Sequence, residues 1–243
     1  MTEPALRFHQ LAKRYGDTSV LQGVDLEVGA GECVALVGVN GAGKTSLMKC
    51  LLDFCAVDGG SIAIFGRDHR QPAARAPLGF LPERFTPPYY LTGTEFIQYI
   101  LSLHGQAADP AAIAAMAQAL DLEGSALKRT VRSYSKGMTQ KLGLAACLLA
   151  EPDLLILDEP MSGLDPLARA RVKQLLRQLR AQGRTLFFTS HALSDVEEIC
   201  EHMVVLHQGS LRFSGSPRAL LQSHSCDSME QAFLACIESG SHG

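Results

Sequence analysis

Apolar and polar residues alternate in short stretches from residue 6 to residue 37. The clearest stretch, residues 24–28, reads Val-Asp-Leu-Glu-Val and has an apolar side chain at every second position. Such alternation is typical of a β-strand with one buried face. Glycine-containing turns at residues 15–17 and 29–31 interrupt the pattern. We therefore predict an antiparallel β-sheet region with tight turns at the start of the chain.

Other stretches are apolar without alternation. Residues 154–157 read Leu-Leu-Ile-Leu, which is typical of a strand buried on both faces of a parallel sheet. Residues 33–37 form a second short apolar stretch, also predicted to be a strand. We predict further strands at residues 61–66, 78–83, 185–189 and 203–206.

Helical spacing dominates residues 86–150. Thr92 and Glu95 form a capping box at the start of the first predicted helix. The apolar residues that follow it recur at helical spacing: Phe96, Ile97, Ile100 and Leu103. Further helices are predicted over residues 109–120, with a proline in the first turn, and over the apolar residues 142–150. Residues 86–150 are therefore predicted to be a helical subdomain inserted into an α/β body.

The rest of the chain returns to alternating strands and helices. Asp165 is predicted to cap a helix that ends at Gly183. The inner stripe of this helix is predicted to contain Val172, Leu175, Leu176 and Leu179. Residues 192–200 are predicted to be helical, and so is the tail from Pro217, with a second capping box at Ser228 and Gln231.

We expect one domain over residues 1–243. Its core would comprise residues 1–85 and 151–222, and residues 223–243 would form a short helical tail. An apolar fraction of 47% is ample for the core of a globular protein.

Charge and cysteine usage narrow the classes of partner. A net charge of −3 and the lack of a basic run give no sign of binding to nucleic acid or anionic lipid. The 7 cysteines lack Cys-x-x-Cys spacing and are typical of reduced thiols in a cytosolic protein. The sequence contains neither a secretory signal nor an apolar run long enough to cross a bilayer. If the protein works at a membrane, another polypeptide is expected to supply the membrane part.

A glycine-rich loop joins the strand of residues 33–37 to a helix. It has the spacing of a phosphate-binding loop, in the order Gly38, Val39, Asn40, Gly41, Ala42, Gly43, Lys44, Thr45. The glycines let backbone N–H groups point at phosphates, Lys44 reaches the terminal phosphates, and Thr45 offers its hydroxyl to Mg²⁺. The helix that begins near Lys44 adds the positive end of its dipole. We therefore predict a nucleoside triphosphate site.

Two adjacent carboxylates, Asp158 and Glu159, follow the apolar strand at residues 154–157. An aspartate at this place in a phosphate-loop protein holds Mg²⁺, usually through water. Glu159 is suited to orient and deprotonate the attacking water. The alternative is that Glu159 only caps or solvates the strand end, and the accompanying phosphate loop favours the catalytic interpretation.

Four further features bear on the function. Residues 134–140 read Tyr-Ser-Lys-Gly-Met-Thr-Gln and precede an apolar helix, where a serine and a glycine would make a second anion site. Residues 162–165, Ser-Gly-Leu-Asp, lie shortly after Glu159. His191 stands alone after a strand, and a lone histidine is more often structural than functional. Tyr15 is either a half-buried aromatic at a strand end or a ring that stacks on a nucleotide base.

In this order and spacing, these stretches resemble the nucleotide-binding subunit of ATP-binding-cassette (ABC) transporters over nearly the whole chain. The resemblance implies an α/β fold: a P-loop NTPase core with a parallel sheet, an N-terminal antiparallel β subdomain and an inserted α-helical subdomain. It also implies ATP and Mg²⁺ as the bound groups, and two facing copies that each hold half of a site.

The resemblance implies a role for each motif. Tyr15 would stack on adenine, and His191 would contact the γ-phosphate. Asp158 would hold Mg²⁺, and Glu159 would be the general base. The residues implied to cradle the phosphates are Gly38, Asn40, Gly41, Ala42, Gly43, Lys44, Thr45 and Ser46. The residues implied to complete the ATP site of the facing subunit are Ser135, Lys136, Gly137 and, at the dimer interface formed by residues 162–165, Asp165.

Two positions depart from the family pattern. The signature motif usually reads Leu-Ser-Gly-Gly-Gln, whereas here Lys136 replaces its first glycine and only Ser135 and Gly137 match. This form resembles the subclass that serves exporters with separate membrane subunits. The loop after Phe80 has Glu83 where a glutamine is usual. Glu83 would reach Mg²⁺ through water and sense the membrane partner, or it is a solvated loop acid.

The leading hypothesis is an ATPase that powers an ABC membrane transporter, with export as the direction. ATP would close a homodimer and hydrolysis would reopen it. The chain would bind an integral membrane permease, without nucleic acid, and lie on the cytoplasmic face of the cell membrane through that permease.

Two other classes of protein account for the motifs less well. A soluble ABC ATPase that acts on ribosomes or DNA would need fused cassettes or long coiled coils, for which there is no room between Lys44 and Ser135. A P-loop kinase or GTPase would leave residues 134–140, residues 162–165 and His191 unexplained.

Overall fold

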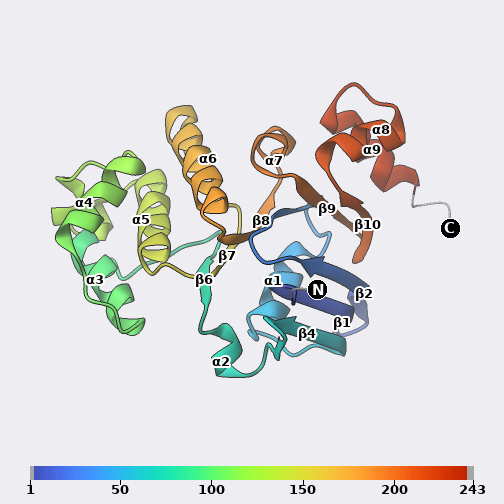
Figure 1. The fold of residues 1–243 in the computed structure, drawn as a ribbon, viewed down its shortest axis with the longest axis horizontal. Helices are drawn as coiled ribbons and strands as arrows, with labels where there is room; N and C mark the ends of the chain where they lie inside the picture. The colour runs from blue at the N-terminus through green and yellow to red at the C-terminus, as the bar shows by residue number, and fades with distance from the viewer. Residues whose placement is uncertain (1–2, 240–243) are drawn as a thin grey trace.

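A six-stranded sheet crosses the middle of the molecule in the computed structural model, which describes residues 3–239 (Figure 1). Its strands, in spatial order, are β10 (Ser210–Gly215), β9 (His202–His207), β3 (Cys33–Val37), β8 (Thr185–Ser190), β7 (Leu154–Leu157) and β6 (Leu78–Leu81). All neighbouring pairs are parallel except β9 and β10. Because carboxyl ends of parallel strands meet at one edge, the loops after β3, β7 and β8 are brought together there.

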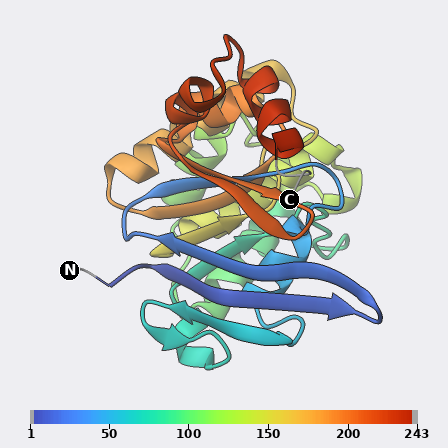
Figure 2. The ribbon, with the colours of Figure 1, turned by 90° about the vertical axis from the view of Figure 1, so that its right-hand side faces the viewer.

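A second sheet is antiparallel and has the order β2-β1-β4-β5. Its strands are β1 (Leu6–Tyr15), β2 (Thr18–Val28), β4 (Gly59–Ile64) and β5 (Arg67–Asp68). The alternation that predicted this region matches the burial of β2, whose inward positions include Val24, Leu26 and Val28. Figure 2 shows the long blue strands of this sheet below the six-stranded sheet and away from the red C-terminal helices.

Both faces of the six-stranded sheet are buried. Val34 and Leu36 of β3 face a cluster that includes helix α1 and the antiparallel sheet. Ala35 and Val37 face the opposite cluster, which includes α5, α6 and α7. Successive side chains of a strand point to opposite faces, so a strand covered on both sides is apolar throughout. The predicted α/β fold with a parallel and an antiparallel sheet is confirmed.

The helices are spread across the whole molecule in Figure 1. The α-helices are α1 (Lys44–Leu51), α2 (Pro72–Arg75), α3 (Gly93–Leu103), α4 (Pro110–Ala119), α5 (Lys136–Leu149), α6 (Pro166–Ala181), α7 (Leu193–Ile199), α8 (Pro217–His224) and α9 (Met229–Ser239). Two short 3₁₀ turns, η1 (Ala126–Lys128) and η2 (Val131–Ser133), precede α5. Among the helices of residues 3–239, none has both the length and the apolar character needed to cross a bilayer.

The capping box of α3 forms as predicted, because Glu95 N donates to Thr92 Oγ1 at 3.2 Å and Thr92 N donates to Glu95 Oε2 at 2.7 Å. The helix extends to Leu103, the last apolar residue of the predicted helical spacing, but Leu103 is 65% exposed. Leu103 lies in the last turn of α3, inside the exposed segment 102–107, and Leu101 is buried in its place. The division of the chain into a separate subdomain at residues 86–150 stays a prediction.

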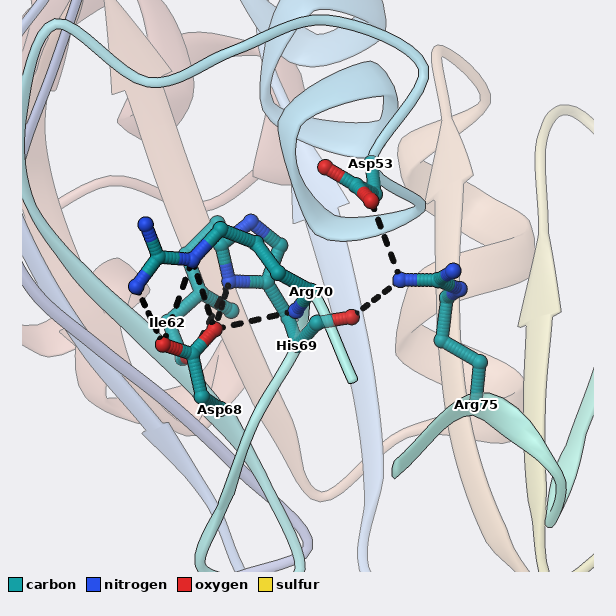
Figure 3. A network of polar contacts seen from close by, with 6 residues as sticks. All are labelled: Asp53, Ile62, Asp68, His69, Arg70 and Arg75. Carbon is teal, nitrogen blue, oxygen red and sulfur yellow. Dashed lines mark hydrogen bonds and ion pairs between the residues drawn. The ribbon is translucent and has the colours of Figure 1, made fainter. Parts of the chain in front are cut away.

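A polar network holds the β5 hairpin and α2 against the end of α1 (Figure 3). Arg70 Nη2 lies 2.5 Å from a carboxylate oxygen of Asp68. Arg75 Nη1 contacts the Asp53 carboxylate at 3.2 Å and the carbonyl oxygen of His69 at 2.5 Å. Because Asp53 lies two residues after α1, the network fixes the C-terminal end of the helix that follows the glycine-rich loop.

Candidate functional site

The glycine-rich loop passes so close to other backbone that two of its positions exclude side chains. A Cβ atom at Gly38 would lie 2.4 Å from the carbonyl oxygen of Leu206. At Gly43, where φ is +111°, a Cβ atom would lie 2.9 Å from the carbonyl oxygen of Val20. The loop therefore leaves β3 and enters α1 along a path that only glycine permits at these positions.

Lys44 is folded over this loop. Its Nζ atom donates to the carbonyl oxygens of Gly38 at 2.5 Å and Val39 at 3.2 Å. Burial lowers the pKa of Lys44, while Glu159 and other nearby carboxylates oppose the shift. The ammonium group is thus a partly desolvated cation among carboxylates, suited to bind an anion that displaces the loop carbonyls.

Asp158 and Glu159 are held by Thr189, the residue before the end of β8. The Thr189 hydroxyl donates to Asp158 Oδ1 at 2.6 Å and accepts from Glu159 N at 2.9 Å. Burial is the main cause that raises the pKa of Asp158, and repulsion by Glu83 adds to it. The hydrogen bond from Thr189 and the charge of Lys44 act in the opposite direction. Thr189 was not predicted from the sequence as a site residue.

Glu159 adopts a left-handed backbone with φ +49°. A residue with a Cβ atom pays strain energy there, and such residues are frequent at functional sites. Glu159 Oε2 lies 2.8 Å from His191 Nδ1, which follows β8 directly. The His191 side chain is 65% exposed and the Glu159 side chain 13%. The histidine that stands alone in the sequence is therefore paired with the predicted base.

These groups surround one cavity of about 600 Å³. The predicted site residues that line it are Asn40, Gly41, Ala42, Gly43, Lys44, Thr45, Ser46, Glu83, Asp158, Glu159 and His191. Gly38 contributes its carbonyl oxygen to Lys44. Tyr15, Ser135, Lys136, Gly137 and Asp165 lie outside this lining.

Tyr15 lies next to the cavity, at the end of β1. Its hydroxyl contacts the side chain of Ser46, which lines the cavity, and its ring is 47% exposed. The hydrogen bond from its hydroxyl to Cys55 Sγ is the main cause that raises the pKa of Tyr15. A role in stacking on a base stays a prediction.

The residues of the signature motif contact a different part of the same chain. Ser135 caps α5 and accepts a hydrogen bond from Met138 N at 3.2 Å. The helix thus begins at Lys136, before the predicted start at residue 142. Lys136 Nζ lies 3.4 Å from Ser162 Oγ, and Gln140 Nε2 donates to the carbonyl oxygen of Pro160 at 3.2 Å. Within one chain, these residues contact the segment after Glu159 and are absent from the cavity lining.

The oxygen atoms at the cavity fit a magnesium ion that is also bound by a phosphate ligand. Thr45, Asp158 and Glu83 line the same cavity, and Asp158 is placed there by its bond to Thr189. Mg²⁺ usually takes one or two carboxylates and completes its shell with water and phosphate oxygens.

A buried ion cluster joins the helices that follow Asp165 and His191. Asp195 of α7 is 3% exposed. Its carboxylate oxygens lie 3.5 Å from Arg169 Nε and 3.4 Å from Lys173 Nζ, both on α6. At 3.5 Å the Arg169 contact is an ion pair and not a hydrogen bond. The cluster holds α6 and α7 at a fixed spacing behind the site.

Replacing Asp195→Ala is expected to lower the free energy of unfolding by about 2 kcal/mol, because it removes a buried carboxylate that faces Arg169 and Lys173, while Lys173 keeps its ion pair with Glu198 at 2.7 Å. Urea denaturation followed by circular dichroism measures the change. Glu197→Ala, at an exposed position of the same helix, is the control and should change the free energy by less than about 0.5 kcal/mol. Equal losses in the two variants would contradict a buried ion cluster.

Comparisons with known proteins agree on one family. The family model described as ABC transporter matches residues 21–162. An uncharacterized ABC transporter ATP-binding protein of Synechocystis sp. is 41% identical over 199 residues, which are 81% of this chain and 56% of that protein. The Nod factor export ATP-binding protein I of Paraburkholderia xenovorans is 36% identical over 235 residues, 95% of this chain and 77% of that protein. The chain thus spans little more than half of the cyanobacterial relative.

A solved structure of an ATP binding subunit of an ABC transporter has the same fold. It superposes with a TM-score of 0.87 at 28% sequence identity. The match covers 96% of this chain and 99% of that one.

Proposed function

This chain belongs to the ABC transporter family, and we propose that it is the ATP-binding and ATP-hydrolysing subunit of a membrane transporter that works as an exporter. The observation that carries the proposal is the convergence of Lys44, Asp158 and the Glu159–His191 pair on the cavity lined by the phosphate loop. A triphosphate would place its charges against the loop N–H groups and its terminal phosphate beside the two carboxylates.

Binding of ATP would use groups that are already oriented. Lys44 Nζ would exchange its bonds with Gly38 and Val39 for phosphate oxygens, which carry more negative charge than a carbonyl. The α1 N-terminus would add its dipole. Thr45 and Asp158 would hold Mg²⁺, with Glu83 nearby, and the ion would neutralise charge that develops on the phosphates.

Hydrolysis would depend on Glu159 and His191. Glu159 would orient a water molecule and accept its proton, because its backbone is held by the bond from its N–H to Thr189 and its carboxylate contacts His191 at the cavity. The contact between His191 Nδ1 and Glu159 leaves Nε2 on the far side of the ring, where it would donate to the γ-phosphate. These roles require that Glu159 be ionised.

A second copy of the chain would complete the site. The placement of Ser135 and Gly137 outside the cavity supports the proposal that they act on ATP held by a facing subunit. The N–H groups at the α5 N-terminus and the Ser135 hydroxyl are suited to bind a phosphate. Residues 162–165, with Asp165, would line the interface. A homodimer would then hold two ATP molecules between its subunits.

The membrane partner would dock beside Glu83. A second cavity of about 430 Å³ is lined by Phe54, Phe80, Glu83 and neighbouring residues, and it borders the Mg²⁺ carboxylate Asp158. Phe54 is 68% exposed and packs against Phe80 with ring centroids 6.0 Å apart. Such an apolar groove suits a helix of an integral permease on the cytoplasmic face of the membrane. Export is favoured because a relative that matches 95% of the chain is a Nod factor export protein.

Purification of the affinity-tagged full chain from detergent-solubilised membranes tests this proposal. We expect an integral membrane protein to co-purify with it. Phe54→Ala should reduce the recovery of that protein, because it removes the exposed ring of the groove, while Leu234→Ala on α9 is a control with a similarly exposed apolar side chain. Recovery of the chain only in ribosome or DNA complexes would contradict the transporter proposal.

A further inference from the structure

Two cysteines lie in contact at the far end of the helix that follows the phosphate loop. Cys50 is in the last turn of α1, and Cys55 follows the turn after this helix, with their Sγ atoms 3.6 Å apart. Asp53, with φ +60°, turns the chain back, and Arg75 holds its carboxylate at 3.2 Å (Figure 3). The turn that places Cys55 beside Cys50 is therefore fixed from outside.

Cys55 also contacts the aromatic residue next to the nucleotide cavity. The Tyr15 hydroxyl donates to Cys55 Sγ at 3.7 Å. The same hydroxyl contacts the side chain of Ser46, which lines the cavity. Cys55 thus contacts both Cys50 and Tyr15.

We propose that Cys50 and Cys55 are a redox-active pair that hydrogen peroxide converts to a disulfide, and that this modification weakens ATP binding by displacing Tyr15. The effect on ATP rests on the proposed function, whereas the formation of the disulfide does not. In a reducing compartment such a bond would be transient and regulatory.

The two thiols differ in a way that assigns the order of reaction. Cys50 is 0% exposed, and burial raises its pKa to about 12. Cys55 is half-buried and so accessible to a small oxidant. Because a small oxidant can reach Cys55 but not the buried Cys50, Cys55 is the residue that attacks peroxide.

The reaction balances with hydrogen peroxide as the oxidant. The Cys55 thiolate attacks one oxygen, the O–O bond breaks, and the products are a sulfenic acid on Cys55 and hydroxide, which takes a proton to become water. The sulfur of Cys50 then attacks the sulfur of Cys55, the S–O bond breaks, and the leaving hydroxyl departs as water with the proton of Cys50. Two thiols lose two electrons and one peroxide becomes two waters.

Disulfide formation would move Cys55 relative to Tyr15. A disulfide bond is about 2.0 Å long, so the two sulfur atoms must come much closer together than their present separation of 3.6 Å. The Tyr15 hydroxyl would lose its acceptor at the present position. Stacking of a base on one aromatic ring raises the affinity about 5-fold or more. We therefore expect the loss of this contact to weaken ATP binding by about 5-fold.

Peptide mapping by mass spectrometry after peroxide treatment of the folded full-length protein tests the chemistry. We expect a disulfide between Cys50 and Cys55 that a dithiol reductant removes. Cys33 and Cys200 supply an internal control, because their Sγ atoms are only 3.3 Å apart but both residues are buried. This second pair should stay reduced. If the Cys50–Cys55 disulfide fails to form, or forms only in unfolded protein, the proposal is overturned.

ATP affinity before and after oxidation tests the coupling. Oxidised wild-type protein should bind ATP about 5-fold more weakly than reduced protein. Cys55→Ser keeps an acceptor for Tyr15 and should bind ATP normally but not respond to peroxide, whereas Cys226→Ser, a half-buried cysteine near α9, should respond as wild type does. Tyr15→Ala should bind weakly in both states. An unchanged affinity of the mapped disulfide form overturns the coupling, while reduced protein that binds no ATP refutes the proposed function instead.

Discussion

Glu159→Gln is expected to bind ATP but to hydrolyse it at least about 100-fold more slowly than the wild-type protein. Glutamine keeps the size and the backbone bond to Thr189 but cannot accept a proton from water. With hydrolysis blocked, the proposed dimer should accumulate with ATP trapped inside. Phosphate release measures the turnover, and size-exclusion chromatography with light scattering in the presence of ATP and Mg²⁺ measures the dimer.

Glu151→Gln is the matched control for this variant. Glu151 lies just before β7, whereas Glu159 lies just after it, and the side chain of Glu151 is 75% exposed. The control should hydrolyse ATP at nearly the wild-type rate and show no trapped dimer. Wild-type turnover by Glu159→Gln would refute the assignment of the general base.

Lys44→Ala is expected to weaken ATP binding by about 100-fold or more and to abolish measurable hydrolysis. The substitution removes the cation that three carboxylates and two loop carbonyls now surround, so the phosphates would face carboxylate charge alone. Isothermal titration with ATP and Mg²⁺ measures the affinity. Glu159→Gln should retain binding under the same conditions, so the two variants separate binding from chemistry.

Lys49→Ala controls for the loss of a lysine from the same helix. Lys49 is exposed in the last turn of α1, at the opposite end from the loop. It should bind and hydrolyse ATP as the wild type does. Unchanged affinity and turnover in Lys44→Ala would rule out the phosphate-binding role of the loop.

The central strands and the phosphate loop could be predicted because their constraints are local. β3 and β7 are buried on both faces, which demands continuous apolar stretches. Backbone atoms lie so close to Gly38 and Gly43 that neither position has room for a side chain. The loop therefore needs glycine at these positions, and the sequence shows it. In these elements, burial and close backbone contacts restrict the residue type at each position.

The hydrogen bonds of Thr189 to Asp158 and Glu159 could not be predicted from the sequence, because they depend on the register of two strands. Thr189 and Asp158 are 31 positions apart in sequence. They meet because Leu157 pairs with Phe188 in parallel β7 and β8, which brings the next residues together. The pairing of His191 with Glu159 arises in the same way, from two neighbouring strand ends. A lone threonine or histidine carries no local sign of such a partner.

Edge elements were missed for a different reason. β10 is half-buried along its length, so its apolar residues do not alternate clearly. The two-residue strand β5 is too short for a pattern. At Leu103 the helical spacing of apolar residues continues into the last turn of α3, where Leu103 itself is exposed. A periodic pattern of apolar residues arises where one face of an element is buried. Where an element is only partly buried, the pattern is weak and does not predict the element.

The contact between α5 and the segment after Glu159 has a consequence for how two ATP sites would communicate. In the proposed dimer, Ser135 serves one site, whereas Glu159 of the same chain serves the other. A Cβ atom at Gly137 would lie 3.2 Å from the carbonyl oxygen of Gly163, and Gln140 holds the carbonyl oxygen of Pro160. Occupancy of one site would then bias the geometry of the other through a path inside a single polypeptide. Such a free-energy coupling would be seen as cooperativity, with a Hill coefficient for ATP hydrolysis that departs from unity.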